Sequence, residues 1–177
     1  DAWEPGEHGA HQRLEHFVTH ALEDYDQRDE PAMAATSDLS PHLRWGEVSP
    51  YQVWHRLHGA LEPEQRKNAS AFLRQLAWRE FNWNEHFHCE DITTVNVRRE
   101  FDAFPWRDAP AAEVDRWRTG TTGFDLVDAG MRELWHSGAM HNRVRLATAS
   151  FLVKNLLVDW RVGEQWFWDT LVDADSA

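Results

Sequence analysis

Residues 140–160, MHNRVRLATASFLVKNLLVDW, are the stretch that decides the fold class. Apolar side chains recur in it every three or four residues, which is the period of one face of an α-helix. This spacing predicts the longest helix of the chain over residues 140–160, with Gly163 ending it. The apolar positions are Val144, Ala147, Phe151, Leu152, Leu156 and Trp160.

The same helical period recurs on both sides of this stretch. It predicts helices over residues 7–29, from Pro50 onward, and over residues 63–87, 111–118, 126–136 and 164–171. Ser49 and Gln52 form a capping box before the second of these helices, and Asp125 is expected to cap the helix over 126–136. No segment alternates with period two. The chain is therefore predicted to be all-α, with an ordered loop over residues 89–110 and a single domain over residues 1–177.

Composition excludes several classes of protein. Of the 177 residues, 42% are hydrophobic and 27% are charged, so the chain can bury a core. The net charge of −12 excludes a generally basic nucleic-acid coat, but it leaves room for a local basic groove. The single cysteine, Cys89, excludes a disulfide scaffold and fits a reducing compartment. We expect a cytoplasmic protein, because no secretory signal and no apolar run long enough for a membrane span are present.

Histidine pairs are weak candidates for metal binding. His16 and His20 are four residues apart on a predicted helix, but no carboxylate general base lies between them. His86, His88 and Cys89 lack a partner pair elsewhere in the chain. We therefore expect no metal site.

Two segments in the N-terminal half could bind a ligand. Residues 36–41, TSDLSP, place hydroxyls and backbone N–H groups before a helix, which suits a phosphate or pyrophosphate; an ordinary helix cap is the alternative. Trp78 lies beside Arg79, so an indole that can stack on a flat ligand neighbours a guanidinium that can pair with an anion. The alternative there is a core tryptophan beside a structural Arg–Glu pair.

Two further segments lie in the C-terminal half. Asn142 and Arg145 share one face of a helix that is otherwise apolar, and a bound cofactor would supply partners for them. Asp173 and Asp175 follow a helix directly, where solvated carboxylates are the alternative.

Taken together, these motifs have the order and approximate spacing of the photolyase/cryptochrome family. The chain resembles the helical FAD-binding domain of class I DNA photolyases over nearly its whole length. The resemblance implies an incomplete chain, without the α/β antenna domain, its pigment and the C-terminal end. The motifs are Thr36-Ser-x-Leu-Ser, Leu76-x-Trp-Arg-Glu-Phe, Gly123-Phe-x-x-Val-Asp-Ala-x-Met-Arg-x-Leu, Met140-His-Asn-Arg-x-Arg, Ala149-Ser-Phe-Leu-Val-Lys, Asp159-Trp-Arg-x-Gly-Glu and Leu171-x-Asp-x-Asp.

The resemblance implies two sets of residues around a folded FAD. The pyrophosphate and ribityl set is Tyr25, Thr36, Ser37, Leu39, Ser40 and Arg79, with the spacing from Tyr25 to Thr36 about one residue off the family pattern. The set around the isoalloxazine and adenine is Asn142, Arg145, Asp173 and Asp175. Arg145 and Asp173 are expected to form a buried ion pair, since an unpaired charge there would be costly.

The implied reaction is light-driven splitting of cyclobutane pyrimidine dimers by a monomer that binds damaged DNA and no membrane. Trp78 would stack on the extruded lesion, Gln75 would hydrogen-bond to it, and Asn142 would lie between lesion and flavin. Arg28 would contact the DNA backbone. Trp160 and Trp106 match the middle and outer members of the tryptophan relay that reduces the flavin.

One departure from the family pattern leaves alternatives open. Gln75 stands where many class I enzymes have a glutamate, and glutamine cannot act as an acid or a negative charge. Some cryptochromes and (6-4) photolyases also carry glutamine there. A blue-light photoreceptor that binds FAD without repair is the second hypothesis. A (6-4) photolyase is the third, because Asn142 replaces a histidine of that subfamily.

Overall fold

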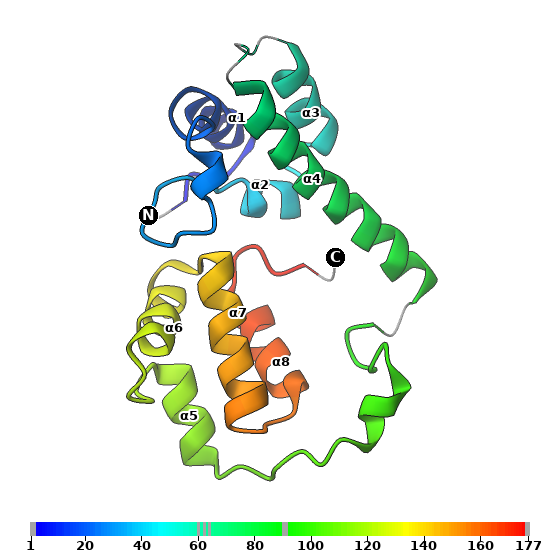
Figure 1. The fold of residues 1–177 in the computed structure, drawn as a ribbon, viewed down its shortest axis with the longest axis vertical. Helices are drawn as coiled ribbons and strands as arrows, with labels where there is room; N and C mark the ends of the chain where they lie inside the picture. The colour runs from blue at the N-terminus through cyan, green and yellow to red at the C-terminus, as the bar shows by residue number, and fades with distance from the viewer. Residues whose placement is uncertain (1–2, 60, 62, 64, 90–91, 176–177) are drawn as a thin grey trace. The chain divides into compact units, whose positions relative to one another are not determined.

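The structure is a computed structural model that describes residues 3–59, 61, 63, 65–89 and 92–175. These residues form helices and no strand, which confirms the predicted all-α class. They fall into two compact helical units, the first up to residue 88 and the second from residue 89 (Figure 1). Each unit has its own hydrophobic core. The single domain over residues 1–177 stays a prediction.

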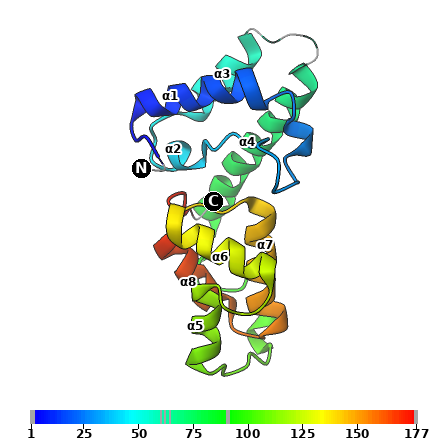
Figure 2. The same cartoon turned by 90° about the vertical axis from the view of Figure 1, so that its left-hand side faces the viewer.

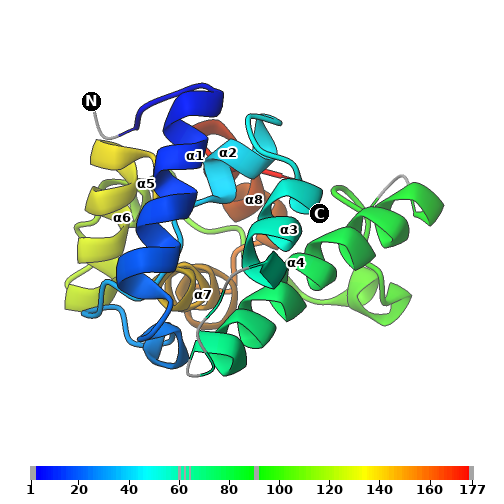
Figure 3. The ribbon, with the colours of Figure 1, turned by 90° about the horizontal axis from the view of Figure 1, so that it is seen from above.

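The first unit contains four α-helices. The first of them continues through a π-helical turn and is followed by a short 3₁₀ turn. The longest helix, α4, extends beyond the other helices of this unit at its C-terminal half (Figures 1 and 3). The elements are α1 (Glu7–His16), the π turn (Phe17–Ala21), the 3₁₀ turn (Tyr25–Gln27), α2 (Ser40–Arg44), α3 (Pro50–Gly59) and α4 (Gln65–His88).

The start of α3 is the predicted capping box. The Gln52 side chain accepts a hydrogen bond from the Ser49 backbone N–H at 2.7 Å, and Ser49 Oγ accepts one from the Gln52 backbone N–H at 3.2 Å. Two N–H groups that the helix leaves unpaired are thus satisfied by neighbouring side chains.

The Glu47 carboxylate, in the turn after α2, joins the N-terminal segment to a buried histidine of α2. Nδ1 of His42 lies 2.6 Å from Oε2 of Glu47, and Oε1 of Glu47 accepts the Gly6 backbone N–H at 2.7 Å. The hydrogen bond from His42, and then the one from Gly6, hold the pKa of Glu47 below its ordinary value of 4.5. One carboxylate therefore connects parts of the chain that are about forty residues apart, from Gly6 to Glu47.

The second unit contains four further α-helices after a long loop. Figure 2 shows α5, α6, α7 and α8 together in this unit. In its described residues, 89 and 92–110, the predicted loop is confirmed apart from one 3₁₀ turn; residues 90 and 91 lie outside the described residues. The elements are the 3₁₀ turn (Arg99–Ala103), α5 (Ala111–Thr119), α6 (Asp125–Ser137), α7 (Asn142–Ser150), a π turn (Phe151–Asn155) and α8 (Trp160–Thr170).

The prediction of one helix over residues 140–160 is wrong. The helix ends after Asn155, Leu157 has a positive φ of 53°, and Asp159 caps a new helix by accepting the Arg161 backbone N–H at 3.0 Å. The apolar run across residues 156–158 hides this break, because those side chains keep a helical spacing while the backbone turns. The longest helix is α4, with 24 residues.

The sequence predicts that Gly163 ends one helix and that another starts at Glu164, and both predictions are wrong, because Gly163 lies inside α8. Gly163 is buried, and a Cβ there would lie 2.7 Å from Cδ2 of Leu152. The missing side chain therefore allows the π turn after α7 to pack closely against α8.

Asp125 does not cap α6, because it is the first residue of that helix and Phe124 occupies the cap position. The carboxylate that satisfies the preceding loop belongs to Asp128, which accepts the Thr122 backbone N–H at 2.8 Å, the Thr122 hydroxyl at 2.6 Å and the Gly123 backbone N–H at 2.9 Å. Burial raises the pKa of Asp128, but these hydrogen bonds lower it by more, so that it lies below its ordinary value. The predicted end of α5 is confirmed, with Gly120 in the left-handed region.

Trp117 is the centre of the second core. It is fully buried, its ring lies 5.6 Å from that of Phe167, and its indole N–H donates to the Thr148 carbonyl at 3.0 Å. One side chain of α5 thereby packs against α8 and hydrogen-bonds to α7. A buried indole needs such an acceptor, and the Thr148 carbonyl needs the donor.

We expect Glu47→Gln to reduce the thermal stability of the protein near neutral pH and to have less effect in acid. Because the folded-state pKa of Glu47 is depressed, its contribution is present above the unfolded value near 4.5 and is lost as the pH falls through the folded value. Melting temperatures of both proteins across this pH range test the prediction. Glu23→Gln, at an exposed position, is the control, and a difference that stays constant with pH would contradict the prediction.

Trp117→Phe should lower the free energy of unfolding by about 1–3 kcal/mol, because it leaves the Thr148 carbonyl unpaired and a void beside Phe167. Urea unfolding measures the change. Trp135→Phe, in the same unit at an exposed position, should stay within about 0.5 kcal/mol of the parent. Equal effects of the two substitutions would show that Trp117 is not central to the core.

Candidate functional site

The turn before α2 keeps most of its polar groups within itself. Thr36 Oγ1 donates to Asp38 at 2.9 Å, and Ser37 Oγ accepts the Leu39 backbone N–H at 3.4 Å. Asp38 has a positive φ of 51° and lies 3.6 Å from Arg13. Leu39 is buried in the first core, and Ser40 begins α2. The turn is therefore built locally, with an exposed hydroxyl at Ser40.

Arg79 connects α4 to α2. Its guanidinium donates to Glu80 at 2.8 Å and to the Leu43 carbonyl at 3.4 Å, and lies 5.9 Å from the ring of Trp83. The structural Arg–Glu pair considered above thus forms. Because α2 begins at Ser40, the same short helix carries the end of the predicted turn and the contact with Arg79.

Tyr25 lies in the first core rather than on a surface. It is 5% exposed, and its ring packs edge-on against Phe17 at 5.6 Å and Phe72 at 5.4 Å. Burial raises the pKa of its hydroxyl. The guanidinium of Arg28 lies 5.0 Å from the same ring. A cofactor contact by Tyr25 and a DNA contact by Arg28 stay predictions.

The C-terminal half of α4 presents exposed aromatic side chains. Trp78 is 59% exposed and lies edge-on to Phe81 at 5.6 Å, so it is not a core residue. Gln75 is exposed as well, and it lies three residues before Trp78, on the same face of the helix. An amide and an open indole therefore occupy neighbouring positions on one face.

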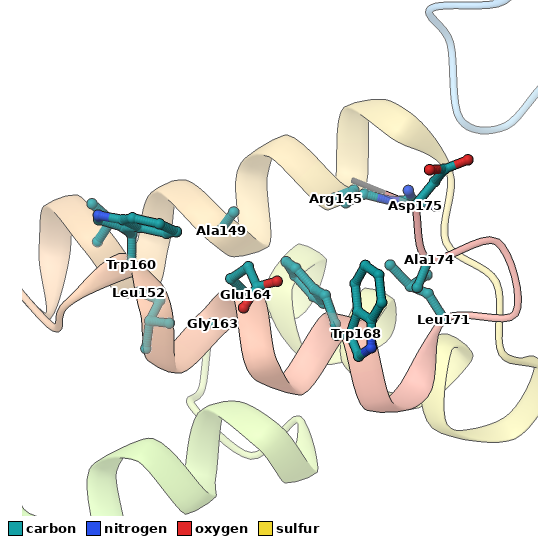
Figure 4. A pocket seen from close by; sticks show the side chains of 12 residues that line it. Arg145, Ala149, Leu152, Trp160, Gly163, Glu164, Trp168, Leu171, Ala174 and Asp175 are labelled. Atoms are coloured by element: carbon teal, nitrogen blue, oxygen red, sulfur yellow. The ribbon is translucent and has the colours of Figure 1, made fainter. Parts of the chain in front are cut away.

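A cavity of about 320 Å³ lies in the second unit. Arg145 and Asp175 lie at one end and Trp160 at the other (Figure 4). Between them the lining is mainly apolar and aromatic. The residues that line the cavity are Arg145, Ala149, Leu152, Val153, Trp160, Gly163, Glu164, Phe167, Trp168, Leu171, Ala174 and Asp175.

Arg145 is the cation of this cavity. Its Nη2 donates to both carboxylate oxygens of Asp173, at 3.1 and 3.2 Å, and to the Met140 carbonyl at 3.4 Å. The predicted ion pair with Asp173 therefore forms. Nε of Arg145 is buried, and in the part of the chain that the structure describes it has no hydrogen-bond partner. A charged donor is thus available to a ligand with an acceptor atom.

Asn142 does not line this cavity. It is the first residue of α7, it is exposed, and His141 caps the helix by accepting the Arg143 backbone N–H at 3.2 Å. The structure thus brings Arg145, Asp173, Asp175 and Trp160 together within the second unit. That Asn142 contacts the flavin together with these residues stays a prediction.

Trp160 is held by two residues that the sequence did not indicate. Its indole N–H donates to Asn96 at 2.8 Å, and the guanidinium of Arg161 lies 4.6 Å from its ring. Asn96 lies in the aperiodic loop, where no pattern marks it. Arg161 lay inside a quoted motif, and only its position next to Trp160 could have indicated a contact.

Trp106 lies in a segment that is hydrogen-bonded to the turn before α8. Its ring lies 4.4 Å from that of Phe104, and the next residue, Arg107, donates from its backbone to the Leu157 carbonyl at 2.8 Å and from Nε to the Leu156 carbonyl at 3.0 Å. Trp106 and Trp160 thus lie in connected parts of the second unit. Their order in an electron relay stays a prediction.

The described residues contain no group of three or more metal-ligating side chains suited to an ion. His16 and His20 stack on each other with ring centroids 4.6 Å apart. None of the described helices combines the length and the apolar character that crossing a membrane requires.

Known proteins resemble this chain over its full length. The family model described as the FAD binding domain of DNA photolyase matches residues 72–177. A deoxyribodipyrimidine photo-lyase of Agrobacterium fabrum is 50% identical over 100% of this chain and 37% of its own length. Cryptochrome-2 of Arabidopsis thaliana is 39% identical over 98% of this chain and 30% of its own length. The chain thus spans 37% and 30% of the length of these two relatives.

Among solved structures, a bacterial class III photolyase from Agrobacterium tumefaciens has a TM-score of 0.93 and 49% identity, covering 99% of this chain and 36% of its own. That neighbour is a class III photolyase, whereas the motifs of this chain resemble class I enzymes. Both classes belong to the photolyase/cryptochrome family that the motifs predict. The chain therefore belongs to the photolyase/cryptochrome family, as part of its helical FAD-binding domain.

Proposed function

We propose that this chain binds FAD and is the flavin-binding part of an enzyme that repairs cyclobutane pyrimidine dimers in DNA with light. The observation that carries the proposal is the cavity at Arg145. A partly buried ion pair lies at its polar end, and apolar and indole side chains form the rest. A flat ring system with polar atoms along one edge is complementary to this distribution.

The residues present fit a flavin. Nε of Arg145 is a buried donor without an acceptor in the described residues, and the carbonyl oxygens and ring nitrogens of an isoalloxazine are acceptors. Asp173 keeps the guanidinium oriented through both of its carboxylate oxygens. We assign Arg145, Asp173 and Asp175 to the ring and adenine side. In the first unit, we assign Ser37, Ser40 and Arg79 to the phosphates, since hydroxyls and a guanidinium suit anions.

FAD, when bound, would supply the electron that splits the dimer. The chain would hold the lesion and the flavin and exclude water. Trp78 offers an open indole face on which an extruded base can stack, and Gln75 can donate and accept hydrogen bonds beside it. The hydrogen bond from Trp160 to Asn96 fixes the indole that we assign to the relay, with Trp106 as its outer member.

Damaged DNA is the proposed partner of a monomeric, cytoplasmic protein. With a net charge of −12, the chain cannot rely on general attraction to phosphates. Arg143 and Lys154, both exposed, are nearby cations that could form a local basic rim. An acidic exterior would then limit binding to undamaged DNA.

A blue-light photoreceptor without repair activity is the second candidate. Cryptochromes of Arabidopsis and Sinapis alba match this chain at 39% and 38% identity, close to several photo-lyases. Gln75 fits either function. A (6-4) photolyase is the third candidate, because Asn142 stands where that subfamily has a histidine.

Asp173→Asn should lower the affinity for FAD about tenfold and the free energy of unfolding by about 1–2 kcal/mol, because Arg145 loses a charged, two-oxygen acceptor. Quenching of flavin fluorescence measures the first effect, and urea unfolding without FAD measures the second. Asp169→Asn, at an exposed position of α8, should change neither. If a folded Asp173→Asn protein binds FAD with unchanged affinity, the isoalloxazine ring does not bind in this cavity.

The FAD-loaded protein should restore intact thymines in a dimer-containing oligonucleotide under blue light and not in the dark. Trp78→Ala should reduce repair at least about tenfold while FAD binding stays unchanged, because base–aromatic stacking is worth about 1–3 kcal/mol. Tyr51→Ala, an exposed aromatic of α3, is the control. Photoreduction of the flavin without any repair would instead establish the photoreceptor.

A further inference from the structure

A second hollow of the second unit shares no residue with the cavity at Arg145. It has a volume of about 230 Å³ and is lined by Arg118, Thr119, Arg132, Trp135 and Trp166. These residues come from α5, α6 and α8 (Figure 2). Arg132 belongs to the quoted motif that begins at Gly123, but none of the five residues has been assigned to the flavin, the lesion or the relay.

Both arginines of this hollow have unused hydrogen-bonding capacity. The guanidinium of Arg118 lies 5.2 Å from the ring of Trp166 and 3.5 Å from Asp115, and its Nε is buried without a partner in the described residues. Arg132 forms no hydrogen bond or ion pair within that part of the chain, although its charge helps to lower the pKa of Asp128. Two cations therefore border a small space that no carboxylate lines.

The position of Arg132 is set by the end of α5. Gly120 adopts a φ of +63°, and a Cβ there would lie 2.9 Å from Cγ of Arg132. The glycine that ends α5 thus lets the stem of Arg132 lie against the backbone, on the same side of α6 as Trp135 three residues later.

The two indoles form a stacked pair with one open face. The rings of Trp135 and Trp166 are inclined by 9° with centroids 5.8 Å apart, and Trp135 is 72% exposed. Neither indole N–H has a hydrogen-bond acceptor in the described residues. An exposed tryptophan beside two guanidinium groups is unusual in a stability role, because its burial gains little and its face remains in water.

We propose that this hollow binds a planar heteroaromatic ring that carries a phosphate or carboxylate, with the ring on Trp135 and the anion on Arg118 and Arg132. Apart from the Thr119 hydroxyl, the lining side chains offer only donors, so the ligand must supply acceptors. The volume lies below the ~300–1,000 Å³ of sites for drug-sized molecules, so it accepts one ring system rather than a dinucleotide. The site is independent of the proposed flavin cavity.

The test uses ¹H–¹⁵N spectra of the tryptophan indoles in the FAD-loaded protein freed of excess FAD, with AMP as the probe. Peaks are assigned to Trp135 and Trp166 by single replacements with phenylalanine. AMP should shift these two peaks in a saturable manner. Adenosine, which lacks the anion, and inorganic phosphate, which lacks the ring, should each bind at least about ten-fold more weakly, since one charge-assisted hydrogen bond is worth about that factor.

Two variants and two controls make the result specific. Trp135→Ala and Arg132→Gln, both at exposed positions, should weaken AMP binding at least about ten-fold without changing the circular dichroism spectrum. The matched controls in the first unit, Trp45→Ala and Arg74→Gln, should bind AMP as the parent does. No shift of the Trp135 and Trp166 peaks, or equal binding by all four variants, would overturn the proposal.

A single-stranded oligo(dA) distinguishes the sources of such a ligand. Tighter binding of the oligonucleotide than of AMP at the same two indoles supports the site and assigns it to a nucleic-acid strand. Binding of AMP alone supports it and assigns it to a free nucleotide. Because the readout is at Trp135 and Trp166, repeating it without FAD separates failure of this site from failure of flavin binding.

Discussion

The reversal of the chain between α7 and α8 is the constraint on which the cavity of the second unit depends. Leu157 turns with a positive φ, Arg107 donates to its carbonyl, and Asp159 caps the following helix. These local interactions bring α8 back along α7, so that Trp160 and Trp168 face the same space as Arg145. Without this turn a continuous helix would carry Trp160 away from the arginine.

Most helices could be predicted from the sequence, because their signals are local. The capping box at Ser49 and Gln52 and the glycine after α5 act on their own immediate neighbours. The turn at Leu157 could not be predicted, since leucine gives no signal for a positive φ and the apolar period continues across it. The role of Asp128 could not be predicted either. Asp125 stands where a helix cap is normally found, whereas Asp128 lies inside α6 and accepts hydrogen bonds from the preceding loop.

The residues of the candidate site were predicted by motif, and their partners only in part. The pair of Arg145 and Asp173 follows from the cost of an unpaired charge away from water, and it forms. The contact of Trp160 with Asn96 joins residues 64 positions apart, and no local rule links an aperiodic loop to a helix start. Tyr25 shows the opposite case, since an aromatic assigned to a ligand lies in the core.

The tryptophans serve surfaces and cavities more than the core. All eleven lie in described residues, and only Trp117 is buried. Their abundance therefore reflects rings kept available for contact, along α4 and around two hollows of the second unit. Two glycines make room for side chains at these hollows. Because Gly120 and Gly163 have no Cβ, Arg132 and Leu152 can lie directly against their backbone.

The π turn after α7 constrains the number of residues in this segment as well as their types. Five residues, 151–155, form a wider turn than an α-helix would, and it precedes the residues that reverse the chain. Deleting one residue of this segment before Lys154 would shift each following side chain by one position along the turn. Lys154 would then take the place of Val153 on the cavity wall. Homologous chains should therefore tolerate exchanges of side chains in this segment much better than gaps.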